Sequence, residues 1–176
     1  ELMSECIAPI SVEYFSMCNR LVSRKVYERQ MVEPFEGVNM WDDVGLSIRV
    51  RFYVRDTAVI NEPFYHYNRI NMTSTTKRPL LDRVKEQVIC VNHIEDFFKK
   101  ENALEKYSLF ISYLKLHTKE ELFSYDAYLW LNTFREANRY IWRLRDKFRS
   151  KYVRRYYVLI YGGLLGKFVW KIFWKK

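Results

Sequence analysis

The chain of 176 residues has the length of one compact domain or of one piece of a larger protein, and its 49% hydrophobic and 18% aromatic content excludes a largely disordered protein. Five glycines and four prolines are too few for a β-sandwich or a propeller, which need many tight turns, so we expect a mainly helical chain. The formal charge of +9 is unevenly distributed, because residues 135–176 hold 13 Lys or Arg and two acids. The positive charge therefore indicates what this segment binds and not what the whole chain binds.

The first part of the chain predicts a helix followed by a break. Over residues 11–30, apolar residues recur at helical spacing, with Phe15, Cys18, Val22 and Val26 roughly on one side. Pro34 and Gly37 then interrupt the pattern.

Residues 43–55 carry two conflicting patterns. Every even position from Val44 to Val54 is apolar, which is the period-two signal of a strand. The same side chains also stack four residues apart on a helix. Periodicity alone favours a strand, although the helical stacking conflicts with it.

A short β element is expected next. Residues 57–60 and 64–69 lie on either side of Pro63 and are rich in β-branched and aromatic residues, which favours two short extended pieces. A polar loop then runs from Asn71 to Pro79.

The second half of the chain has helical patterns. Apolar residues recur at three- and four-residue steps over residues 81–98, and a further apolar helix is expected over residues 107–116. The cleanest pattern predicts a helix over residues 126–150. Its apolar face consists of Trp130, Phe134, Ala137, Ile141, Leu144 and Phe148, and its far side carries Arg135, Arg139 and Arg143.

The tail, residues 151–176, mixes aromatic and basic residues. Its uncharged stretch from Tyr156 to Gly166 is too short for a bilayer span, which needs about 20 apolar residues. Aromatic side chains among lysines and arginines favour a segment that lies on an anionic membrane. The expected membrane contacts are Arg154, Arg155, Trp170, Lys171 and Trp174. Packing of the tail on the protein itself is the alternative.

Three linked stretches, "CNRLVSRKVYE", "EPFEGVNMWDDVGLSIRVRFY" and "AVINEPFYHYNRINMTSTT", resemble the second half of bacterial family 2 glycosyltransferases. In that family, a helix leads to an acidic pair in "G-x-x-x-x-E/D-D", and an "I-N-E/K-P-L-Y-x-Y-R" element and an "S-x-T/S" loop follow. The resemblance covers roughly residues 10–77, and the order and spacing of its elements make it fairly specific.

The resemblance implies a GT-A fold, in which a nucleotide-binding half precedes the acceptor half. The chain begins at Glu1 and contains no DxD metal motif, so we expect the acceptor-side fragment of a longer enzyme, inactive by itself. The full enzyme would use Mg or Mn, and no cofactor is expected for the fragment. The expected fold is mainly α with a short β element (α+β). Residues 1–78 would complete the glycosyltransferase domain, residues 79–150 would form a helical extension, and residues 151–176 the tail.

The resemblance makes Asp43 the base that removes the proton from the acceptor hydroxyl in an inverting sugar transfer. Asp42 replaces the more usual Glu and has a less defined role. A carboxylate at the start of a helix is stabilised there, so this implication favours helix over strand for residues 43–55. An acidic N-cap pair with no chemistry is the alternative.

Further site residues follow from the same resemblance. Trp41 would stack on an acceptor sugar, with a core role as the alternative. Tyr65 and Tyr67 occupy the family's acceptor-side "Y-x-Y" element, and His66 between them would reach the metal or the donor diphosphate, or be a half-buried structural residue. Arg69, displaced by one position from the family's arginine, and Ser74 are the expected phosphate contacts.

The expected function is transfer of a sugar from a nucleotide-sugar donor to a glycan or lipid-linked acceptor in cell-surface polysaccharide synthesis. We expect a cytoplasmic protein, peripheral at the inner face of the cell membrane, because no secretory signal is present and three cysteines form no CxxC pair. Self-association is expected where the lost half would expose apolar surface.

The alternative function is that of a non-catalytic basic and aromatic module that binds a membrane surface or nucleic acid. The acidic pair argues against this alternative, because a surface that binds polyanions has no use for it. We therefore expect no nucleic-acid partner.

Overall fold

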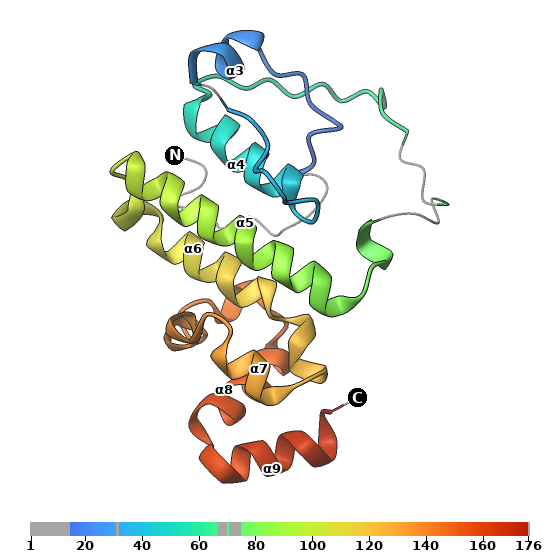
Figure 1. Ribbon diagram of the computed structural model, residues 1–176, viewed down its shortest axis with the longest axis vertical. Helices are drawn as coiled ribbons and strands as arrows, with labels where there is room; N and C mark the ends of the chain where they lie inside the picture. The colour runs from blue at the N-terminus through green and yellow to red at the C-terminus, as the bar shows by residue number, and fades with distance from the viewer. Residues whose placement is uncertain (1–14, 31, 67–69, 71–74, 176) are drawn as a thin grey trace. The chain divides into compact units, whose positions relative to one another are not determined.

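The computed structural model describes residues 15–30, 32–66, 70 and 75–175, and the regular elements in this part of the chain are helices (Figure 1). The chain divides into two compact units, one of residues 8–102 and one that contains residues 103–176. The functional boundaries expected at residues 78 and 150 stay predictions.

The first unit consists of α3 (Arg24–Gln30), α4 (Asp42–Tyr53), the short 3₁₀ helix η1 (Thr75–Lys77) and α5 (Leu80–Lys100). Helix α4 packs against α5 (Figure 1). Ile48 of α4 and Val91 and Ile94 of α5 are fully buried. Burial of such side chains drives the packing of these two helices, since each one removed from water stabilises the fold by about 1.5–3 kcal/mol.

Gly45 permits the close packing around α4. A Cβ atom at this position would lie 2.7 Å from the Phe35 ring and 3.2 Å from the Cys90 sulfur. Phe35 also stacks on His93 of α5, and the Arg49 guanidinium lies 3.8 Å above its ring. The helix expected for residues 43–55 is confirmed, and these contacts fix which face of α4 is buried.

The second unit is built from short helices around α6 (Leu104–Thr118). The chain continues through η2 (Glu121–Ser124), α7 (Ala127–Asn132), η3 (Arg135–Tyr140), η4 (Arg145–Lys147), α8 (Ser150–Tyr161) and α9 (Gly163–Phe173). Every residue from Phe110 to Leu116 is buried, including the polar Ser112 and Lys115, so this stretch of α6 lies in the interior, whereas the first turn of the helix is partly exposed.

The expected β element, and with it the α+β fold, is wrong for the part of the chain that the structure describes. No described residue lies in a strand, and residues 55–66 form an exposed segment without regular structure after α4 ends at its C-cap, Val54. The β-branched and aromatic residues there favour an extended backbone, but a strand is stable only when another strand pairs with it. The described residues supply no such partner.

The two long helices expected over residues 11–30 and 126–150 are also wrong in extent. In the described part of the first range, Phe15 is helical, residues 16–23 are not, and α3 covers Arg24–Gln30. The non-helical stretch contacts α4, where the Arg20 guanidinium donates to the Ser47 hydroxyl at 2.7 Å. In the second range the helix stops at Asn132, where Thr133 becomes extended and Phe134 has a φ of 47°. Short 3₁₀ turns follow.

Candidate functional site

The turn before α4 is held in place by Glu86 of α5. Its Oε2 accepts hydrogen bonds from the backbone N–H groups of Met40 (2.8 Å) and Asn39 (3.1 Å). Its Oε1 lies 2.7 Å from Nη1 of Arg78. Trp41, the next residue, has a left-handed backbone with a φ of 70°, which few non-glycine residues adopt. Glu86 therefore anchors the strained turn that starts α4.

The acidic pair opens the helix. Asp42 and Asp43 are the first two residues of α4, and the Trp41 carbonyl accepts the first helical hydrogen bond, from the Gly45 N–H at 3.0 Å. The free N–H groups of a helix N-terminus stabilise negative charge, typically by 0.3–1 kcal/mol for each charge. The pair is thus placed where two neighbouring carboxylates are tolerated.

Asp43 faces a small polar cluster. Its Oδ2 accepts a hydrogen bond from the Met17 backbone N–H at 3.3 Å, and its side chain is half-buried. Arg20 lies close enough for the Asp43 charge to raise its pKa, although burial and the charge of Arg51 lower that pKa overall. Ser47, one turn after Asp43, is fully buried and accepts a hydrogen bond from Arg20. Asp43, Arg20 and Ser47 thus form one polar cluster at the start of α4.

Asp42 differs from its neighbour. It is exposed, yet the atoms around it partly desolvate its carboxyl group, and this desolvation raises its pKa. The backbone N–H groups of Asp43 and Asp42 oppose the rise, whereas the Asp43 charge adds to it. Desolvation therefore makes the Asp42 carboxyl group take up a proton more readily than an ordinary aspartate does.

The remaining expected site residues are distributed as follows. Trp41 is half-buried, and its carbonyl accepts a hydrogen bond from the Cys90 thiol at 3.3 Å, so its backbone supports the turn. Tyr65 and His66 are exposed in the segment of residues 55–66. The expected site residues Tyr67, Arg69 and Ser74 lie outside the described residues.

Arg20 and Ser47 were not expected as site residues. A signal for Ser47 is present in the sequence, because a helix over residues 43–55 places it one turn after Asp43 on the same face. Arg20 has no such local signal. Its approach to Ser47 joins residues 27 positions apart and depends on the path of the chain between them.

The described residues do not fit a resident metal ion. No group of three or more His, Cys, Asp or Glu side chains among them is arranged to hold one. The acidic pair alone offers two carboxylates, and Mg²⁺ uses so few protein ligands only where waters and substrate phosphates complete its coordination. No step is therefore assigned to a metal on these residues.

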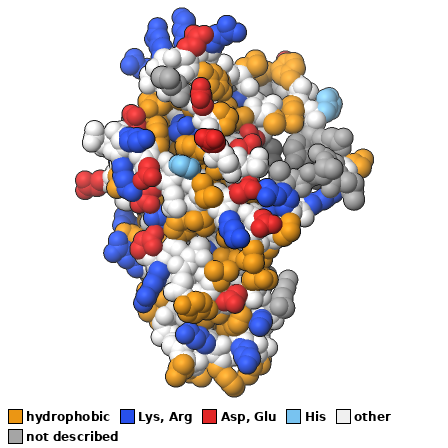
Figure 2. All heavy atoms as spheres, viewed as in Figure 1, with side chains coloured by type: hydrophobic (Ala, Val, Ile, Leu, Met, Phe, Trp, Pro, Cys, Tyr) orange, Lys and Arg blue, Asp and Glu red, His pale blue; other side chains and the backbone are white. Residues whose placement is uncertain are grey.

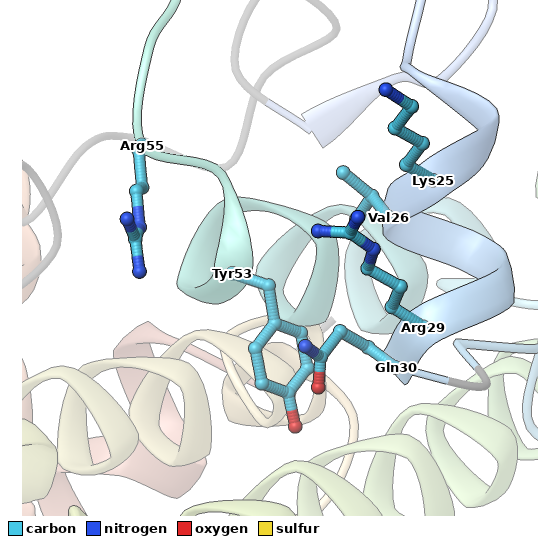
Figure 3. A pocket seen from close by; sticks show the side chains of 6 residues that line it. All are labelled: Lys25, Val26, Arg29, Gln30, Tyr53 and Arg55. Carbon is cyan, nitrogen blue, oxygen red and sulfur yellow. The ribbon is translucent and has the colours of Figure 1, made fainter.

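A basic pocket lies at the other end of α4 (Figure 3). It has a volume of about 310 Å³ and is lined by Lys25, Val26, Arg29, Gln30, Tyr53 and Arg55. Tyr53 donates a hydrogen bond to Glu101 at 2.8 Å, and burial together with this bond raises its pKa to about 12. Three cationic side chains suit an anion. At 1.5 Å per residue, Tyr53 lies about 15 Å along the helix from Asp43, so the pocket does not contain the acidic pair.

The residues expected to contact a membrane fall into two groups. Arg154 and Lys171 are exposed, whereas Trp170 is buried and its indole N–H donates to the Phe123 carbonyl. Trp174 is half-buried, with its ring 5.8 Å from that of Phe123 and 5.5 Å from the Arg155 guanidinium. The two tryptophans thus fix the tail onto its own unit. No helix among the described residues has the length and apolar character of a membrane span.

Comparisons of the chain with protein-family models, with curated proteins and with solved structures found no match in any of the three.

Proposed function

We propose that this chain is the acceptor-side part of an inverting glycosyltransferase, in which Asp43 acts as the base. The single observation that carries the proposal is the position of the acidic pair. The resemblance to family 2 glycosyltransferases predicted that the pair opens a helix, against the period-two pattern of residues 43–55, and α4 begins at Asp42.

The surroundings of Asp43 support this role. A general base must remain ionised and must keep an oxygen available for the proton that it removes. The helix N-terminus and the nearby Arg20 guanidinium place positive charge beside the Asp43 carboxyl group. Only Oδ2 accepts a hydrogen bond from the described residues, at Met17, which leaves Oδ1 for an acceptor hydroxyl.

In the proposed reaction, Asp43 takes the proton of the acceptor hydroxyl while that oxygen forms a bond to the anomeric carbon of the donor sugar. The bond from that carbon to the nucleotide diphosphate breaks on the opposite face, so the configuration inverts. The donor is a nucleotide sugar and the acceptor is a glycan or lipid-linked glycan.

The proposal includes a place in the cell. The reaction would occur in the cytoplasm, at the inner face of the cell membrane, where lipid-linked acceptors of cell-surface polysaccharides are assembled. Support comes from the second unit, whose basic C-terminal helices would keep the enzyme near anionic lipid.

The test compares Asp43→Asn with Asp82→Asn in the full-length enzyme. Asparagine keeps an oxygen that accepts the Met17 N–H, so the fold is retained while the base is lost. Asp82 is an exposed acid in the first turn of α5 and serves as the matched control. Transfer of labelled sugar from a panel of nucleotide sugars to membrane-extracted acceptors is the measurement.

Asp43→Asn should lower kcat by about 10²-fold or more, with donor binding unchanged, since a general base contributes roughly 10²–10⁴ to the rate. Asp82→Asn should transfer at the wild-type rate. Undiminished turnover of Asp43→Asn would overturn the assignment and leave the non-catalytic binding module as the better description.

A further inference from the structure

Helix α9 presents an apolar face to solvent. Leu164, Leu165, Phe168 and Ile172 are 86%, 72%, 61% and 55% exposed, whereas Gly166 and Trp170 on the same helix are buried. At 100° per residue the four exposed side chains fall within an arc of about 100°. We refer to these four residues as the apolar stripe. Its outward position reverses the usual arrangement, in which the apolar side of a surface helix faces the core.

The packing of α9 on α8 holds the stripe outward. A Cβ atom at Gly162 would lie 2.3 Å from the Val158 carbonyl and 2.9 Å from the Gly166 Cα, and Gly163 has a φ of 53°. The chain can therefore turn sharply between the two helices, which contact each other. The buried Trp170, bonded to the Phe123 carbonyl, fixes the opposite side of α9.

Positive charge borders the stripe. Lys167 and Lys171 are exposed and lie on one flank of the stripe, Lys171 about 20° and Lys167 about 60° from its edge on the helix circumference. In Figure 2, hydrophobic side chains gather over α9 at the lower edge of the view, with Lys and Arg side chains beside them. Residues 147–176 contain nine Lys or Arg and no Asp or Glu.

This charge identifies the partner. A second copy of the chain would bring the same nine positive charges and no acid, so close approach of two stripes would be opposed by like-charge repulsion. An anionic bilayer offers both requirements at once, with phosphates for the lysines and acyl chains for the stripe. Helix α9, with 11 residues, is about 16 Å long and suits a position parallel to the membrane plane.

We propose that α9 docks on an anionic lipid bilayer, with the apolar stripe at the boundary between headgroups and acyl chains and with Lys167 and Lys171 on lipid phosphates. The surface differs from the contacts expected from sequence, because Trp170 and Trp174 pack inward and the leucines, Phe168 and Ile172 take their place. The proposal does not depend on the glycosyl-transfer reaction.

The test is co-sedimentation of the whole chain with vesicles of phosphatidylcholine alone or mixed with phosphatidylglycerol. Leu165→Glu combined with Phe168→Glu removes the stripe without disturbing buried residues. The matched control combines Val59→Glu and Ile60→Glu, two apolar residues that are 86% and 62% exposed outside the tail. Circular dichroism checks that all variants keep their helices.

Wild-type chain should sediment with the anionic vesicles. The stripe variant should bind them at least about tenfold more weakly, and the control variant should bind like the wild type. Lys167→Gln combined with Lys171→Gln should weaken binding only where phosphatidylglycerol is present. Equal binding of the stripe variant and the wild type would overturn the proposal. Sedimentation velocity tests the other possible occupant, a second copy of the chain. If the wild type forms a dimer and the stripe variant does not, while the variant still binds vesicles, then a second copy covers the stripe and the membrane proposal is overturned.

Discussion

Glu86 is the residue that connects the core of the first unit to the acidic pair. It bonds the two backbone N–H groups that precede Trp41 and pairs with Arg78. Glu86→Gln keeps the shape of the side chain but replaces one carboxylate oxygen with an NH₂ group. This NH₂ donor must then face other donors, either the Arg78 guanidinium or the backbone N–H groups of Asn39 and Met40. We expect the free energy of unfolding to fall by about 1–3 kcal/mol in urea titrations. Asp96→Asn, in an exposed pair with Lys99 on the same helix, is the control and should change little.

The same carboxyl makes this contribution dependent on pH. Burial alone would raise the pKa of Glu86, but the N–H groups of Met40 and Asn39 and the Arg78 guanidinium outweigh it and lower the pKa below 4.5. Because the folded state binds the proton less tightly than the unfolded chain, the stabilisation is complete above pH 4.5 and is lost as the pH falls through the folded-state pKa. The difference between wild type and Glu86→Gln should shrink accordingly. A difference that stays constant into the acid range would contradict this account.

Lys119 is the corresponding anchor of the second unit. Its ammonium donates to the carbonyls of Trp130 (3.0 Å) and Thr133 (2.9 Å) and to Oδ1 of Asn138, and it lies 4.3 Å from the Trp130 ring. Burial lowers its pKa to about 7, against the attraction of Glu136, which indicates how little water reaches this position.

Lys119→Met should therefore be strongly destabilising. Methionine fills the same volume, but three buried oxygens lose their donor, and removal of one member of such a cluster costs about 3 kcal/mol or more. Urea unfolding followed by tryptophan fluorescence measures the loss, with Lys106→Met on exposed α6 surface as the control. Equal stability of the two variants would show that water or other donors replace the ammonium.

At the level of elements, Lys119 also explains why the apolar pattern of residues 126–150 wrongly predicted one continuous helix. A continuous helix would use the carbonyls of Trp130 and Thr133 to accept from the backbone N–H groups four residues later. Lys119 takes both carbonyls, and the Asn138 side chain takes that of Leu131. The backbone bends at Phe134 instead of continuing.

The burial of that pattern was nevertheless predictable. Five of its six apolar residues are buried, and Phe134, where the backbone turns, is the exception. The spacing of apolar residues indicates which side chains are buried. A series of short helical turns can bury the same side chains as one long helix does. The contact with Lys119, 11 residues before Trp130 and outside the helical pattern, distinguishes the two.

The helix at residues 42–53 shows the opposite case. Its periodicity favoured a strand, because every even position is apolar, and the choice of helix depended on the role implied for the acidic pair. In the structure, residues of both parities are buried, among them Val44, Ser47, Ile48 and Arg49. The buried Arg49 donates hydrogen bonds to the carbonyls of Gly45 and Glu33, and its guanidinium lies over the Phe35 ring. No hydropathy pattern predicts the burial of this charged side chain.

At the level of the whole molecule, the described chain contrasts densely packed helices with one long open segment. Residues Cys90, Val91 and Ile94 of α5 are fully buried, whereas Val59, Ile60 and Phe64 are 86%, 62% and 73% exposed. Over residues 55–66, the only backbone-to-backbone hydrogen bond described is from the Phe64 N–H to the Glu62 carbonyl. Resistance to amide hydrogen exchange follows such differences in burial and hydrogen bonding.

Hydrogen exchange followed by mass spectrometry should therefore separate these regions. Peptides from residues 55–66 should exchange in the fastest class at all protein concentrations, and peptides from the middle of α5 should exchange in the slowest class, since their opening requires the core of the unit to unfold. The exposed end of α9, which is helical but apolar on its outer side, serves as the internal reference for an exposed helix. Protection of residues 55–66 at the level of α5 would contradict the structure, because it would require backbone partners for a segment in which the described residues provide almost none.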